Sequence, residues 1–188
     1  RARKEEVAVV DKTGKVWLNG RLVNYDDARV GLLTHTLHYG LGVFEGIRAY
    51  EGPGGGAVFR LREHLQRLLR SAHIMQLAIP FDLDRLEQAV LETLRANQMR
   101  QGYVRPIVWL GEGAMGLLPS GNPVEVAILV WHWGAYLGAE GLERGIRAKV
   151  SSYTRHHPNI TMTQAKSVGG YVNSILAKRE AHATGHDE

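Results

Sequence analysis

The sequence predicts an α+β fold, in which hairpins of short strands are combined with amphipathic helices. Two observations support this class. Short apolar runs near the N-terminus are separated by turn-forming dipeptides, which is typical of hairpins. Two stretches in the middle of the chain repeat apolar residues every three or four positions, which is typical of helices. Strands and helices do not alternate regularly, as a βαβ series would require.

Turn-forming residues divide the N-terminal part into short strands. The dipeptide Asn19-Gly20 follows one apolar run and is a strong hairpin turn. The glycine-rich segment 52–56 is expected to be a loose hairpin loop, because it lacks the lysine and the spacing of a phosphate-binding loop. Strands are predicted over residues 7–10, 16–18, 43–50 and 57–59.

Two helices and two buried strands are predicted to follow. The first helix covers residues 62–75, and the second begins after Asp82, which is a suitable N-cap. The apolar runs 103–110 and 124–131 predict two buried strands, separated by a loop rich in glycine and proline.

A change in composition near Trp133 predicts a domain boundary. The predicted N-terminal α/β domain covers residues 1–132, the interdomain loop 133–141, and the start of a second, incomplete domain 142–188. Within the second part, we expect a strand over 145–153 and a helix from Tyr171 to about Thr184. Gly185 is a good residue to end that helix.

The composition excludes several classes of protein. Of 188 residues, 44% are hydrophobic and 22% charged, which is ordinary for a globular protein and unlike a disordered one. No apolar run is long enough to cross a membrane. The net charge is only +4, and the basic residues are not interleaved with aromatic ones, so we expect no nucleic-acid partner. Because there is no cysteine, disulfides and thiolate metal sites are impossible, and a cytoplasmic location is predicted.

Lysine and histidine supply the candidate reactive groups. Lys166 ends a polar loop, and small residues and Tyr171 follow it. A lysine with small neighbours and a nearby aromatic ring can form a Schiff base, although the same residues are compatible with a solvated loop lysine. His35 and His38 are three positions apart but have no carboxylate at ligand spacing, so we predict ordinary polar or core histidines and no metal site.

Several motifs in order resemble one family of enzymes. They are Leu37-His38-Tyr39-Gly40, Val43-Phe44-Glu45-Gly46-Ile47-Arg48, the run from Phe59 to Leu68, Tyr103-Val104-Arg105-Pro106, the run from Trp133 to Gly138, and Lys166 with Gly169-Gly170-Tyr171. Together they resemble the branched-chain amino-acid aminotransferases, which are pyridoxal-phosphate enzymes of fold type IV. The resemblance spans nearly the whole chain. It departs at Gly170, where the family often has Asn or Gln.

The resemblance implies a two-domain enzyme that transfers amino groups. It implies that branched-chain L-amino acids (Leu, Ile, Val) and 2-oxoglutarate are the substrates, with L-glutamate as a product and pyridoxal 5′-phosphate as the cofactor. The family's chains continue beyond the point that matches Glu188, so the C-terminal domain is expected to be truncated in this chain. A loop around Gly116 is implied to reach a neighbouring subunit, which predicts a homodimer or a larger homo-oligomer.

Each motif also implies a role for particular residues. Lys166 is the implied catalytic residue and forms the Schiff base. The implied cofactor-binding residues are Arg67 at the phosphate, Lys166, and Tyr171 near the ring. The implied substrate-binding residues are Tyr39, Phe44, Tyr103, Arg105 and Tyr136, with Arg105 meeting the distal carboxylate of glutamate.

Other functions remain open at the level of sequence. Another enzyme of fold type IV, such as a D-amino-acid or amine transaminase or an aminodeoxychorismate lyase, would share the lysine segment. A fragment that is inactive by itself, or that acts only by binding, is an alternative of a different class. The preference among leucine, isoleucine and valine is not determined by these motifs.

Overall fold

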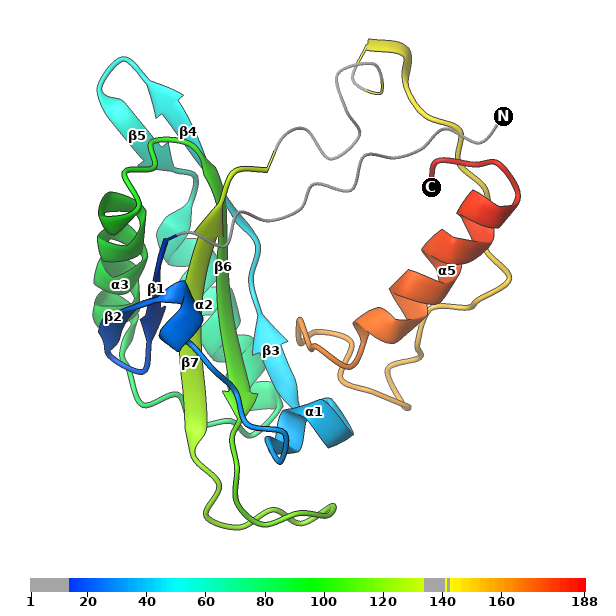
Figure 1. Ribbon diagram of the computed structural model, residues 1–188. Helices are drawn as coiled ribbons and strands as arrows, with labels where there is room; N and C mark the ends of the chain where they lie inside the picture. Colours follow the sequence, from blue (N-terminus) through cyan, green and yellow to red (C-terminus); the bar gives the residue numbers. More distant parts are fainter. Residues whose placement is uncertain (1–13, 134–140, 142) are drawn as a thin grey trace.

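A twisted antiparallel sheet forms the centre of the molecule (Figure 1). The computed structural model describes residues 14–133, 141 and 143–188. In the described part, seven strands are arranged in the order β2-β1-β7-β6-β4-β5, and β3 also pairs with β6. The strands are β1 Lys15–Leu18, β2 Arg21–Asn24, β3 Gly42–Phe44, β4 Ile47–Gly52, β5 Gly55–Val58, β6 Gly102–Leu110 and β7 Val124–Trp131.

The first hairpin forms as its turn dipeptide predicts. Asn19 and Gly20 connect β1 to β2 and both have positive φ angles, 47° and 99°. Two residues of this kind make the turn whose twist matches that of paired strands. The strand predicted over 7–10 lies outside the described residues.

Two of the strand predictions need correction. The strand predicted over 43–50 is interrupted at Glu45 and Gly46, where the Glu45 N–H donates to the Pro106 carbonyl oxygen at 2.9 Å. The chain can therefore form β3 and β4 separately on the same partner, β6. The loop predicted over 52–56 is much shorter, because Gly52 pairs with Gly55 and continues the ladder almost to the turn.

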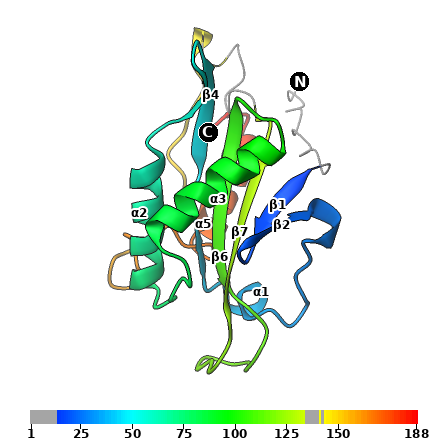
Figure 2. The ribbon, with the colours of Figure 1, turned by 90° about the vertical axis from the view of Figure 1, so that its left-hand side faces the viewer.

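Two helices cover one face of the sheet (Figure 2). They are α2 Leu61–Ile74 and α3 Leu83–Ala96, and α3 begins at the predicted cap, where the Asp82 carboxylate accepts from the Arg85 N–H at 2.8 Å. Their apolar faces pack on the sheet and form the main core. Its largest fully buried members include Trp17, Ile47, Leu65, Leu68, Leu86, Val90, Val104, Val108, Val126 and Ile128.

The opposite face of the sheet carries the side chains that alternate with this core. Along β6, Val104 and Val108 belong to the helix-covered core, so Tyr103, Arg105 and Trp109 point to the other side. The last helix, α5 Tyr171–Ala183, lies on this second side (Figure 1). It ends as predicted, because Gly185 adopts a φ of 78° and closes the last turn.

The strand predicted over 145–153 is wrong. In the described part of the chain these residues have no neighbouring strand with which to form a ladder. Their backbone instead contacts the last residues: the Lys149 N–H donates to the Glu188 carbonyl oxygen, and the Asp187 N–H to that of Arg147. A segment joins a ladder only where another strand can pair with it.

Two short helices were not predicted. They are the 3₁₀ turn η1 Tyr25–Asp27 and the α-helix α1 His35–Tyr39, which ends at Gly40 with a φ of 73°. In the residues that the structure describes, no helix is long and apolar enough to cross a membrane. The predicted division at 132 and the loop 133–141 stay predictions, since most of that loop lies outside the described residues.

Candidate active site

The site begins where the loop before α5 joins the edge strand β3. Ser167 forms an isolated bridge with Val43, and the Phe44 N–H donates to the Lys166 carbonyl oxygen at 3.1 Å. Gly42 allows the chain to pack closely here, because a Cβ there would lie 3.2 Å from Val168 Cγ2 in the loop and 2.9 Å from the Val108 carbonyl oxygen on β6. These contacts hold Lys166 beside a strand from which it is far removed in sequence.

The amine of Lys166 lies between two aromatic rings. Its Nζ donates to the Tyr171 hydroxyl at 2.5 Å. It is also 4.9 Å from the centre of the Phe44 ring and 5.0 Å from that of Tyr171, and the two rings are 4.9 Å apart. Phe44 is buried, so the amine of Lys166 has an apolar surface on one side. The predicted grouping of Lys166, Phe44 and Tyr171 is therefore present.

Helix α2 brings a cation to the same place. Arg67 donates from Nε to Glu45 Oε1 at 2.5 Å and from Nη2 to Glu45 Oε2 at 2.7 Å. Burial opposes ionisation of Glu45, but hydrogen bonds from Arg67 and His64 hold the pKa of this carboxyl below its ordinary value. The hydrogen bond to Glu45 in turn raises the pKa of Arg67, and Tyr171 is close enough to add to that effect.

Arg105 is enclosed by aromatic rings on the same face of the sheet. Its guanidinium carbon is 4.6 Å from the centre of the Phe44 ring, 5.3 Å from that of Tyr103 and 5.5 Å from that of Trp131. Its Nη2 donates to the Tyr103 hydroxyl at 3.3 Å. The buried Nε has no hydrogen-bond partner within the described residues. Such a group can receive a carboxylate beside an apolar surface.

The predicted residues are not all assembled. Phe44 contacts both the Lys166 amine and Arg105, and Arg105 contacts Tyr103, so these form one cluster. Tyr39 lies on α1 with its ring 4.5 Å from that of His35, and the contacts described above do not include it. Tyr136 lies outside the described residues. The substrate roles of Tyr39 and Tyr136 stay predictions.

Four further side chains in this region were given no role from the sequence. Glu45 and His64 hold Arg67, the Ser71 hydroxyl accepts from the Lys166 N–H at 3.1 Å, and Trp131 packs 5.0 Å from the Tyr103 ring. His64, Arg67 and Ser71 have helical spacing, which could have identified a polar stripe on α2. The position of Trp131 depends on its pairing with Tyr103 across β6 and β7, which the sequence does not specify.

The two histidines each contact a backbone carbonyl oxygen. His35 is buried, with Nε2 2.8 Å from the Gly116 carbonyl oxygen, and His38 Nε2 is 2.8 Å from that of Leu32. Across residues 14–133, 141 and 143–188, no group of three or more histidines and acidic side chains could hold a metal ion.

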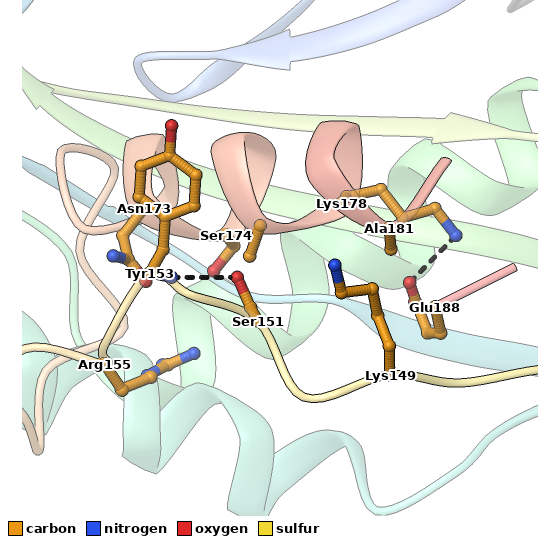
Figure 3. A pocket seen from close by; sticks show the side chains of 10 residues that line it. Lys149, Ser151, Tyr153, Arg155, Asn173, Ser174, Lys178, Ala181 and Glu188 are labelled. Carbon is orange, nitrogen blue, oxygen red and sulfur yellow. Dashed lines mark hydrogen bonds and ion pairs between the residues drawn. The ribbon is translucent and has the colours of Figure 1, made fainter. Parts of the chain in front are cut away.

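A separate pocket of about 330 Å³ lies between α5 and the segment 149–155 (Figure 3). Its lysines are already paired: Lys149 with Glu180 and Lys178 with Glu188, each at 2.9 Å. Because those charges are matched, the cluster around Lys166 is the better candidate for chemistry.

Comparisons with known proteins identify relatives of this chain. The branched-chain-amino-acid aminotransferase of Pseudomonas aeruginosa is 50% identical over 97% of this chain, and that of Escherichia coli is 44% identical over 94%. The chain spans 59% and 58% of the lengths of these two relatives.

Solved structures of branched-chain amino acid aminotransferases also resemble this chain. A crystal structure of the E. coli branched-chain amino acid aminotransferase superposes with a TM-score of 0.92 at 44% identity, over 94% of this chain and 59% of that one. The T.th. enzyme of the same name, with pyridoxamine 5′-phosphate, gives 0.89 at 47% identity, over 94% and 58%. Residues 42–188, which include β3, α2, β6 and the Lys166 loop, match the family described as amino-transferase class IV. Since this match covers most of the chain, the chain belongs to the class IV aminotransferase family.

Proposed function

We propose that this chain binds pyridoxal 5′-phosphate through a Schiff base at Lys166. One observation carries the proposal: the Lys166 amine is 2.5 Å from the Tyr171 hydroxyl and faces the Phe44 ring. The donor set suits the cofactor, because an amine can bond to its aldehyde, flat rings can pack near its ring, and Arg67 is a planar donor for its phosphate. The T.th. structure contains pyridoxamine 5′-phosphate, the amine form of this cofactor, which supports the choice of cofactor.

The proposed reaction is the transfer of an amino group from a branched-chain L-amino acid to 2-oxoglutarate, which gives L-glutamate. When bound, the cofactor supplies an electron sink for the bond that is broken at the substrate Cα. Lys166 Nζ would be the base that takes the proton from the substrate Cα and would deliver it to the carbon that receives it. Tyr171 orients Nζ by accepting its hydrogen bond at 2.5 Å.

The substrate pocket is proposed to lie beside Arg105. Phe44, Tyr103 and Trp131 give it apolar walls, which suit an aliphatic side chain, and the guanidinium suits the distal carboxylate of glutamate. Complexes of the T.th. enzyme with N-(5′-phosphopyridoxyl)-L-glutamate and with 4-methylvaleric acid are in keeping with a site that accepts both kinds of group. The relatives' names favour this reaction over other fold-type IV chemistries.

We further propose that the chain acts as a homodimer or a larger homo-oligomer, in the cytoplasm. His35 ties α1 to the loop before β7 at Gly116, and apolar side chains are exposed near this contact. The most exposed are Leu32, Leu33, Leu37, Leu117 and Leu118. A group of this kind is typical of a surface that another subunit covers. The cysteine-free composition is compatible with the proposed cytoplasmic location.

Reduction with borohydride tests the attachment residue directly. Adding pyridoxal 5′-phosphate to the purified chain should produce visible absorbance, and reduction followed by peptide mapping should place the adduct on Lys166. Added L-leucine should change the spectrum, whereas D-alanine and an aromatic amine should not. The variant Lys166→Ala should lose the adduct, and Lys149→Ala, which changes a lysine paired with Glu180, should keep it. An adduct on another lysine would contradict the proposal.

A further inference from the structure

Glu45 is a fully buried carboxylate that the reaction itself does not need. It lies at the break between β3 and β4, where its backbone is fixed to β6 through Pro106. We propose that Glu45 is a positioning residue, which holds the Arg67 guanidinium in the orientation that binds the cofactor phosphate. This inference rests on the proposed function and adds a residue to it.

The ion pair fixes both the place and the plane of the guanidinium. Glu45 accepts from Nε at 2.5 Å and from Nη2 at 2.7 Å, which is the parallel two-bond geometry of arginine and carboxylate. In the described part of the chain no hydrogen bond involves Nη1. Nη2 also lies 3.5 Å from His64 Nδ1, so the Nε and Nη2 edge of Arg67 is committed to the protein, and Nη1 is available to a ligand.

Glu45 is itself held from two further directions. The Gly46 N–H donates to Oε2 at 3.3 Å, and His64 Nδ1 lies 3.1 Å from the same oxygen. His64 and Arg67 are one turn apart on α2, so the carboxylate joins that helix to the strand break. The Glu45 carboxylate cannot rotate without breaking several of these hydrogen bonds. The Arg67 guanidinium, which is bound to it, is therefore fixed as well.

The pair of Glu45 and Arg67 differs in its burial from a neighbouring ion pair on the surface. Arg60 and Glu63 form a contact at 2.9 Å, but both side chains are more than half exposed. The Glu45 side chain is 0% exposed and that of Arg67 is 46% exposed. A buried ion pair contributes little net stability compared with packed apolar residues, so a geometric role is the better account of its presence. The exposed part of Arg67 is the part that a phosphate can reach.

If Glu45 had a different role, removing its charge would have the opposite effect on phosphate binding by Arg67. If the carboxylate mainly neutralised Arg67, removing its charge would strengthen the attraction between Arg67 and a phosphate. If it positions Arg67, the same change frees the guanidinium to rotate and weakens phosphate binding. The two possibilities therefore differ in the sign of one measurement.

The test compares two ligands that differ only in the phosphate. Affinities for pyridoxal 5′-phosphate and for pyridoxal are measured by absorbance titration for the wild-type chain, Glu45→Gln, Glu45→Asp and the control Glu63→Gln. We expect Glu45→Gln to weaken pyridoxal 5′-phosphate binding by about tenfold or more, the effect of one charged hydrogen bond. Binding of pyridoxal should change by less than about twofold, and Glu63→Gln should leave both affinities unchanged.

A double variant separates positioning from loss of structure. In an Arg67→Ala background, Glu45→Gln should cause no further loss of affinity for pyridoxal 5′-phosphate, because there is no guanidinium left to orient. An equal loss for both ligands, unchanged binding of pyridoxal 5′-phosphate, or tighter binding would each overturn the inference. Failure of the wild-type chain to bind either ligand would instead count against the proposed function. Circular dichroism of each variant identifies any that does not fold, and Glu45→Asp then provides the milder change.

Discussion

At the scale of single residues, the site depends on a few side chains that hold one another in place. Lys166 is oriented by the Tyr171 hydroxyl and Phe44, and its backbone by Ser71. Arg67 is oriented by Glu45. Since each reactive group has a polar partner of its own, the geometry exists before any ligand arrives, which lowers the cost of binding.

The Tyr171 hydroxyl provides the first prediction. Tyr171→Phe removes the group that accepts from Lys166 Nζ but keeps the ring that packs on Phe44. We expect the variant to bind pyridoxal 5′-phosphate up to about tenfold more weakly, because the amine is no longer oriented before the cofactor arrives. Absorbance titration measures the affinity. Tyr153→Phe, which changes a tyrosine of the separate pocket, is the control, and equal affinities for Tyr171→Phe and wild type would disprove the role.

At the scale of elements, helix ends and strand breaks decide where the site residues lie. Helix α2 carries Arg67 and Ser71 on the side that meets β3 and the Lys166 loop, while its other side enters the core through Leu65 and Leu68. The break between β3 and β4 turns Glu45 inward. Helix α3 packs beside α2 on the same face of the sheet. A change at the start of α3 is therefore expected to affect both helices.

The cap of α3 provides the second prediction. Asp82→Ala removes the carboxylate that accepts from the Arg85 N–H, and we expect it to lower the free energy of unfolding by about 1 kcal/mol. Asp82→Asn keeps a capping oxygen and should retain at least about half of that stability. Urea denaturation followed by circular dichroism measures both variants. If alanine and asparagine are equally destabilising, the cap is not the cause.

At the scale of the whole molecule, the acidic side chain of Glu180 on α5 binds the segment 149–152, which comes before that helix. Glu180 accepts from the Ser151 hydroxyl at 2.7 Å, from Lys149 Nζ at 2.9 Å and from the Ser152 N–H at 3.0 Å. The Ser151 hydroxyl and Lys149 together lower the pKa of this carboxyl to about 2. The contact between the segment and the helix therefore depends on pH.

The pH dependence provides the third prediction. An unfolded chain protonates Glu180 near its ordinary pKa of 4.5, whereas the folded protein keeps it ionised down to about 2. The contact therefore stabilises the folded protein above about pH 4.5, and this contribution is lost as the pH falls towards about 2. The melting temperature of the wild type should fall further between pH 5.5 and about 3.5 than that of Glu180→Gln. Parallel curves would show that Glu180 does not contribute.

The sequence by itself determined the local elements and the order of the motifs. The helix over α2, the Asp82 cap, the Asn19-Gly20 turn and the Gly185 helix end follow from periodicity and from residues with special backbone preferences, which act within a few positions. The motifs placed Lys166, Phe44 and Tyr171 in one site by resemblance, and the contacts between them agree.

Only the tertiary structure decided how the pieces meet. The separate strands β3 and β4, the buried pair of Glu45 and Arg67, and the position of Trp131 opposite Tyr103 depend on pairing with β6, a strand distant in sequence. The run 145–153 failed to become a strand for the same reason, since a strand requires a partner that its own residues cannot supply. Local propensity acts through neighbouring residues, whereas burial, register and ion pairs depend on segments that only folding brings together.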